Sequence, residues 1–75
     1  MHLMAHAFHI IETGKHRGKS IGQILGFYPG NQMLEAERLS NLADLTSLAS
    51  DPAASHLDKA AAREMVQEYG WMLNQ

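Results

Sequence analysis

A short glycine-framed basic segment holds the side chains best suited to bind a ligand. Residues 14–20 read Gly-Lys-His-Arg-Gly-Lys-Ser, so three cations and a histidine fall within five positions. Glycine lets backbone N–H groups approach an anion, and Lys and Arg add positive charge. The spacing is not that of a Walker phosphate loop, because only three residues separate the two glycines. The candidate binding residues are Lys15, His16, Arg17 and Lys19; the alternative is a solvated hairpin tip without a ligand.

The basic segment also carries a family resemblance. Residues 13–25 resemble a short element, with the one-letter pattern FGKYKGK, of exonuclease X-type proteins and small bacterial and phage proteins. In that family the element forms a strand, a glycine-framed basic turn and a short helix. Here Thr13 replaces the aromatic residue before the first glycine, and residues 32–35 replace an aromatic continuation. Because the acidic exonuclease motifs are absent, the resemblance implies a nucleic-acid-associated accessory element rather than nuclease chemistry.

Histidines near the N-terminus form a second candidate site. His2, His6 and His9 would share one face of a helix, which is a workable spacing for a metal. On a strand, His9 would point away from the other two. No carboxylate or cysteine lies close by in the sequence, so we predict no metal site and no cofactor. The histidines are then expected to be surface groups.

Catalytic patterns are sparse. The serines have no nucleophile-elbow context, and Asp51 and Asp58 are most simply read as helix caps or surface groups. Glu12 and His16 are best read as an ion pair across the turn. A chain of 75 residues is too short to enclose a deep cleft, so we predict that the protein is not an enzyme.

The back half of the chain predicts two helices. Residues 32–49 lack Gly and Pro and place apolar residues at three- and four-residue steps, with Asn31 as a suitable N-cap. Asp51 is a second N-cap type, and Pro52 fits the first position of a helix that continues to about Leu73. The short break between the two helices predicts an antiparallel hairpin.

The front half predicts a more mixed structure. Residues 5–12 favour a strand, with a helix as the alternative, and residues 14–18 form a glycine-bounded turn. Ser20 and Gln23 have the spacing of a capping box that opens a short helix through Leu25. We therefore expect an α+β fold that is mostly α, in which a short N-terminal strand and basic turn precede an antiparallel two-helix hairpin.

Charge divides this single small domain, residues 1–75, into two parts. Residues 1–30 carry three Lys or Arg and one Glu, whereas residues 31–75 carry three Lys or Arg and seven Asp or Glu. A basic, His- and Gly-rich front therefore precedes an acidic helical hairpin, and this asymmetry concerns partners more than fold. No apolar run is long enough to span a membrane, and the lack of cysteine and of a signal sequence favours the cytoplasm.

Small size predicts that the chain depends on association. A domain below ~70–80 residues has a marginal core, and this one has no cysteine for a disulfide. Its apolar residues exceed what one helix–helix seam needs, and the alternative is that the front segment covers them. The predicted interface residues are Met33, Leu34, Met65, Val66, Tyr69, Trp71 and Met72.

These observations favour a small non-enzymatic binding or regulatory protein. We expect it to dock on a protein partner, as a phage- or mobile-element-type inhibitor would, and to form a homodimer. The alternative is a nucleic-acid-associated accessory module that uses the basic turn of residues 14–19. So few cations would bind nucleic acid weakly and with strong salt dependence.

Overall fold

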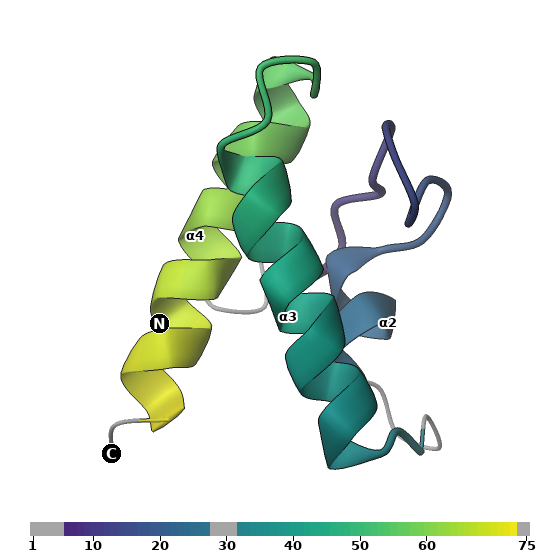
Figure 1. The fold of residues 1–75 in the computed structure, drawn as a ribbon, viewed down its shortest axis with the longest axis vertical. Coiled ribbons are helices and arrows are strands. Elements are labelled where there is room, and N and C mark those ends of the chain that lie inside the picture. Colours follow the sequence, from purple (N-terminus) through teal and green to yellow (C-terminus); the bar gives the residue numbers. More distant parts are fainter. Residues whose placement is uncertain (1–5, 28–31, 74–75) are drawn as a thin grey trace.

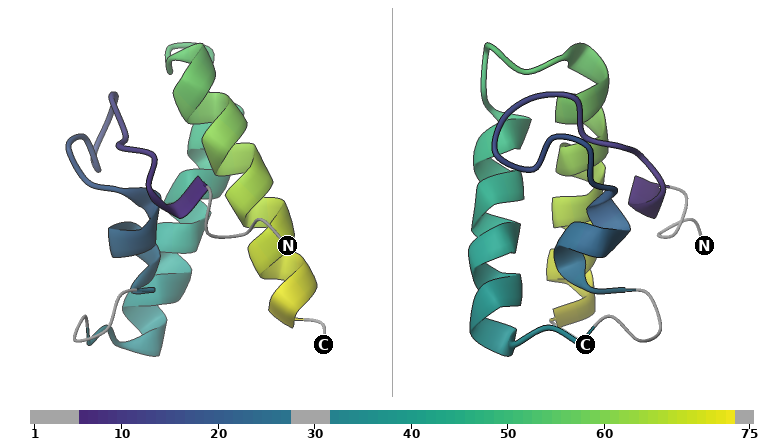
Figure 2. Two further views of the ribbon diagram at one scale, coloured as in Figure 1. Left: turned by 180° about the vertical axis from the view of Figure 1, so that it is seen from behind. Right: turned by 90° about the vertical axis from the view of Figure 1, so that its right-hand side faces the viewer.

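The computed structural model describes residues 6–27 and 32–73, with side chains described through residue 70. Three named helices occur in these ranges: α2 (Ile21–Leu25), α3 (Glu35–Ala49) and α4 (His56–Leu73). The α3 and α4 helices run antiparallel, meet at their connection and diverge toward their other ends (Figure 1). The α2 helix and the preceding loop lie across one side of this pair (Figure 2, right). The predicted helical hairpin is therefore present, with the front segment packed on it.

The core lies where the front segment meets the hairpin. Leu45 of α3 and Met65 of α4 are fully buried, and Ile11 and Leu25 pack against them from the front segment. Ala61 and Ala62 are also buried, and such small side chains allow close helix approach. The rings of Phe27 and Tyr69 stack with centroids 6.1 Å apart, which joins the chain after α2 to α4. The front segment therefore completes a core that the two long helices only begin.

The short α2 helix forms as its sequence predicts. Ser20 Oγ accepts a hydrogen bond from the Gln23 amide (3.2 Å), and Gln23 Oε1 accepts one from the Ser20 amide (3.0 Å). This reciprocal pair confirms the predicted capping box. Gly26 ends the helix with a φ of +71°, a left-handed conformation that favours glycine.

The strand predicted for residues 5–12 is not formed in the described part of that range. His6 and Ala7 are helical, and only an isolated antiparallel bridge joins Ile10 to Ser20. The Ile11 amide donates to the Lys19 carbonyl (2.9 Å), so the two arms of the loop do approach each other. The ladder stops there because the next amides along the chain, at residues 12 and 13, donate to a carboxylate of α4.

Both long helices begin later than predicted. Residues 32–34 are not helical, and α3 starts after Leu34, which provides no side-chain cap; Asn31, the predicted cap, lies outside the described residues. In the connection, Asp51 Oδ1 accepts from the Ala53 amide (2.9 Å) and holds a turn where the second helix was expected to start. Ser55 Oγ then accepts from the amide of Asp58 (3.1 Å), so α4 starts at His56. Two successive polar turns therefore replace the single Asp-Pro start.

Candidate functional site

Asp58 is the polar centre on which the front segment is anchored. It is fully buried, and its Oδ1 lies 2.7 Å from His9 Nε2. Its Oδ2 accepts from the Thr13 hydroxyl (2.8 Å) and from the amides of Thr13 (3.0 Å) and Glu12 (2.9 Å). One carboxylate of α4 therefore holds both the side chain of His9 and the backbone at the start of the basic turn.

The pKa of Asp58 reflects two opposed effects. Burial raises the pKa of this carboxyl group, whereas hydrogen bonds from His9, Thr13 and the Glu12 amide lower it. The hydrogen bonds prevail, and the pKa lies below its ordinary value. The expectation that Asp58 is a helix cap or a surface group is wrong, because its side chain is fully buried. The spacing of Ser55 and Asp58 indicates only a local role at the start of a helix, and no nearby residue indicates which groups this carboxylate binds.

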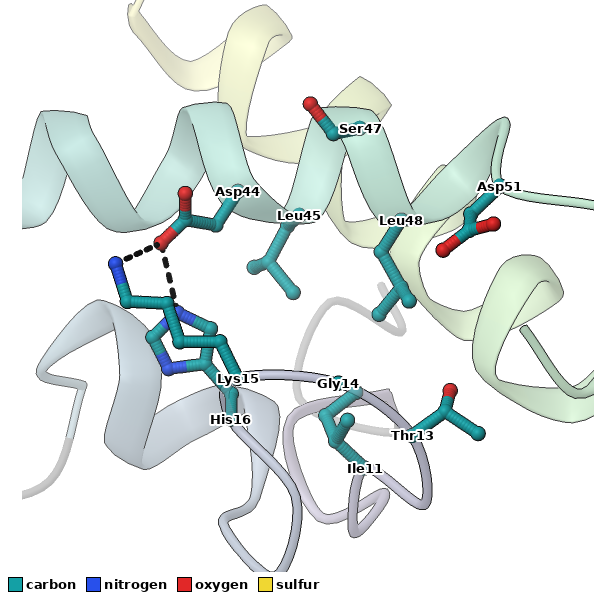
Figure 3. A pocket seen from close by; sticks show the side chains of 10 residues that line it. All are labelled: Ile11, Thr13, Gly14, Lys15, His16, Asp44, Leu45, Ser47, Leu48 and Asp51. Carbon is teal, nitrogen blue, oxygen red and sulfur yellow. Dashed lines mark hydrogen bonds and ion pairs between the residues drawn. The ribbon is translucent and has the colours of Figure 1, made fainter. Parts of the chain in front are cut away.

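Asp44 of α3 binds the basic turn in a second acid–base contact. Its Oδ2 lies 2.8 Å from His16 Nε2 and 3.3 Å from Lys15 Nζ (Figure 3). The hydrogen bond from His16 lowers the pKa of Asp44; burial opposes this, Lys15 reinforces it, and the pKa lies below its ordinary value. The predicted binding turn is thereby divided: Lys15 and His16 are drawn to α3, whereas Arg17 and Lys19 are exposed. The ion pair expected between Glu12 and His16 is replaced by the pair with Asp44.

A pocket of about 370 Å³ lies between the basic turn and the C-terminal half of α3. Its apolar lining comprises Ile11, Leu45 and Leu48 (Figure 3); Ile11 and Leu45 are buried, and Leu48 is partly exposed. The Lys15–His16–Asp44 cluster lies at one end, and Asp51 lies at the other. Its volume falls within the ~300–1,000 Å³ typical of ligand sites. The site therefore places the partly exposed Leu48 between charged ends, of which only the basic end is predicted from the sequence as a binding site.

The predicted interface residues are spread over core and surface. Met65 and Tyr69 are buried, and Val66 is partly buried against the core, so these three face the interior rather than a partner. The reason is that the front segment covers the seam of the hairpin, which is the alternative named above. Leu34 is 76% exposed, and Met33 is half-buried. The side chains of Trp71 and Met72 lie outside the described residues.

The candidate metal ligands are not gathered in the described part of the chain. His9 and His16 face different carboxylates, on α4 and α3 respectively. Among residues 6–27 and 32–70, no three His, Cys, Asp or Glu side chains converge as a metal site would require. His2 lies outside the described residues.

Neither the described helices nor known proteins give a further indication of function. None of the described helices combines the length and apolar character needed to cross a membrane. No family model, curated protein or solved structure matches this chain. The pocket and the contacts around it are therefore the features that indicate a function.

Proposed function

We propose that this chain is a non-catalytic regulatory domain that docks on a protein partner by accepting one of the partner's side chains in the pocket beside α3. The observation that carries this proposal is the pocket itself, in which the partly exposed Leu48 lies between charged groups. Lys15 is 72% exposed at its edge, which leaves that end accessible to a partner. An apolar interior with a polar rim is the usual composition of a protein-binding surface.

The arrangement of hydroxyl groups favours docking over catalysis. An acid–base pair such as His16–Asp44 needs an adjacent nucleophile or an oriented water to act on a substrate. The hydroxyl of Ser47, which lines the pocket, points away from His16 in Figure 3. The Thr13 hydroxyl donates to Asp58 and is occupied. The pair is better suited to hold the basic turn on α3.

Nucleic-acid binding by the basic turn is the less favoured function. Asp44 offsets the charge of Lys15 and engages His16, so the turn offers mainly Arg17 and Lys19 to a phosphate backbone. Two contacts with phosphate would give weak, salt-sensitive binding. The phage- or mobile-element-type role and the cytoplasmic location stay predictions from the sequence.

Self-association belongs to the same proposal. One face of α3, opposite the buried Leu45, is exposed and has no charged side chain. It comprises Ala36, Leu39, Ser40, Ala43 and Ser47. Uncharged, small side chains permit close packing of a second helix, and a second copy would supply one. This face replaces the buried residues of α4 as the basis for the expected homodimer.

The docking proposal is tested by capture from lysate of the source cells, with and without nuclease treatment. Leu48→Lys would place a charge in the aliphatic wall of the pocket, and Leu57→Lys is the matched control because Leu57 is 64% exposed and outside the pocket. We expect wild type and Leu57→Lys to retain the same proteins and Leu48→Lys to lose them. Circular dichroism verifies that both variants fold. Equal retention by all three proteins, or retention that disappears with nuclease, would contradict docking through the pocket.

A further inference from the structure

The two ends of the pocket differ in how far their carboxylates are already neutralised. At one end, Asp44 Oδ2 is hydrogen-bonded to His16 Nε2 and forms an ion pair with Lys15 Nζ. At the other end, Asp51 Oδ1 receives only the Ala53 amide, and its second oxygen has no partner among the described residues. The pocket therefore has one end with its own cations and one end with an uncompensated carboxylate.

The position of Asp51 strengthens the negative potential at that end. It follows the C-terminus of α3, which is the negative end of the helix dipole, and the last turn of α3 contains no basic residue. Arg63 of α4 donates to the Ala49 carbonyl at this end (3.5 Å) rather than to Asp51. A cation delivered by a ligand would therefore find the Asp51 carboxylate without a cationic partner among the described residues.

We propose that the pocket selects a partner segment in which an aliphatic or aromatic side chain lies next to Lys or Arg. The apolar side chain packs against the partly exposed Leu48, and the neighbouring cation pairs with Asp51. This inference rests on the proposed docking function and adds the chemistry of the partner to it.

Charge complementarity selects this partner over an anionic one. The whole chain carries eight acidic and six basic side chains, and residues 31–75, which include Asp51, carry seven and three, so the end of the pocket at Asp51 attracts a basic segment more than an acidic one. An anionic ligand would have Lys15 as its main attraction, and Lys15 is already 3.3 Å from Asp44. The partly exposed Leu48 in turn favours an apolar group, which a purely basic segment lacks.

The experiment is a selection of random twelve-residue peptides displayed on phage, with four immobilised proteins. These are wild type, Leu48→Lys, the surface control Leu57→Lys, and Asp51→Asn. The asparagine retains an oxygen for the Ala53 amide, so the turn is preserved while the charge is removed. We expect enriched peptides to carry Lys or Arg within two positions of Leu, Ile, Phe or Met, and to need Leu48 but not Leu57.

Binding of synthetic copies of these peptides provides the quantitative test. Because Asp51 is exposed, we expect Asp51→Asn to weaken binding by about two- to fivefold and to reduce its dependence on salt. Enriched peptides that need Leu48 but lack basic residues, or bind Asp51→Asn unchanged, would overturn the inference and leave the docking proposal intact. If no peptide depends on Leu48, both fail. A dimer of wild type that Leu48→Lys abolishes would also overturn the inference, because a second copy would then occupy the pocket.

Discussion

At the scale of single residues, two carboxylates decide how the front of the chain is held. Asp58 binds His9, Thr13 and the amide of Glu12 from a fully buried position. Asp44 binds the basic turn from the more exposed surface of α3. A buried charge is costly unless it is paired and hydrogen-bonded, so its partners and the carboxylate depend on one another.

The first prediction concerns the removal of the buried carboxylate. We expect Asp58→Ala to lower the free energy of unfolding by about 3–5 kcal/mol, since it leaves the groups that donate to Asp58 without an acceptor. Urea denaturation measures this difference. Asp51→Ala is the matched control: it removes one exposed hydrogen bond and should cost about 0.5–1.5 kcal/mol. Equal losses in the two variants would contradict the anchoring role of Asp58.

The second prediction is a loss of stability in acid. Asp44 and Asp58 each have a pKa below the ordinary value in the folded protein. Carboxyl groups with a lowered folded pKa stabilise the protein above their unfolded pKa, near ~3.9, and this contribution disappears as the pH falls through the folded pKa. Stability should therefore be retained at neutral pH and decline below about pH 4.

Denaturation with urea across this range of pH tests the acid dependence. The variant Asp58→Asn lacks one of the two titrating groups, so its stability should start lower and change less on acidification. An acid profile of Asp58→Asn with the same slope as that of the wild type would show that Asp58 does not contribute.

At the scale of elements, the front segment acts as the third layer of the core. Side chains of α3 bind both the basic turn and α2. Asp44 binds the basic turn, as described above. Arg38 Nε donates to the Leu25 carbonyl (3.0 Å), and Asn41 donates to the Ile24 carbonyl (2.9 Å). These bonds satisfy carbonyl groups at the end of α2, which a five-residue helix cannot satisfy alone. The position of α2 therefore depends on these bonds to α3, and the turn at Gly26 that follows α2 lies close to Arg38.

The third prediction tests that turn. Gly26 has a φ of +71°, and an added Cβ would lie 3.2 Å from the Cβ of Met33. We expect Gly26→Ala to lower stability by about 1–2 kcal/mol from backbone strain, with a further loss from this contact. Gly14→Ala is the control, since Gly14 has a φ of +86° but no atom within 4 Å of the added Cβ. Thermal melts of the two variants should therefore differ, and identical midpoints would argue against close packing at Gly26.

At the scale of the whole molecule, small size and uneven charge favour association. A chain of 75 residues without cysteine has few means to stabilise itself beyond its core and its partners. Phe8, Ile10, Leu34, Leu39 and Leu57 are each about half or more exposed. The uncharged face of α3 contains Leu39 and offers a surface to a second copy.

The fourth prediction concerns the oligomeric state. We expect sedimentation equilibrium at micromolar concentration to show a dimer, and Leu39→Lys to shift it to a monomer because a charge would be buried between the helices. Leu57→Lys on α4 should leave the dimer unchanged. A wild-type protein that sediments as a monomer over the whole range would refute self-association through α3.

Part of this structure followed from local sequence signals. The apolar spacing of residues 36–49 predicted α3, and the pair Ser20 and Gln23 predicted the start of α2, because both signals act within one or two helical turns. The start of α4 was predicted too early because the connection before it contains two competing caps, at Asp51 and Ser55. The start of α3 was also predicted too early, and this helix begins after Leu34 without a side-chain cap. The strand predicted for residues 5–12 was wrong, because the amides of Glu12 and Thr13 donate to Asp58, which is distant in the sequence. Local β propensity carries no information about such an acceptor.

The candidate site shows the same division more sharply. The sequence by itself determined the helices, the glycine-framed basic turn and the separation of charge, since these depend on neighbours a few residues apart. Only the tertiary structure decided that Asp44 meets a histidine 28 positions away and that Asp58 meets an amide 46 positions away. Such pairs form when the hairpin and the front segment pack together, and that packing also creates the pocket. The physical reason is that caps and helical periodicity act locally, whereas burial of a charge is compensated by whichever donors the fold brings to it.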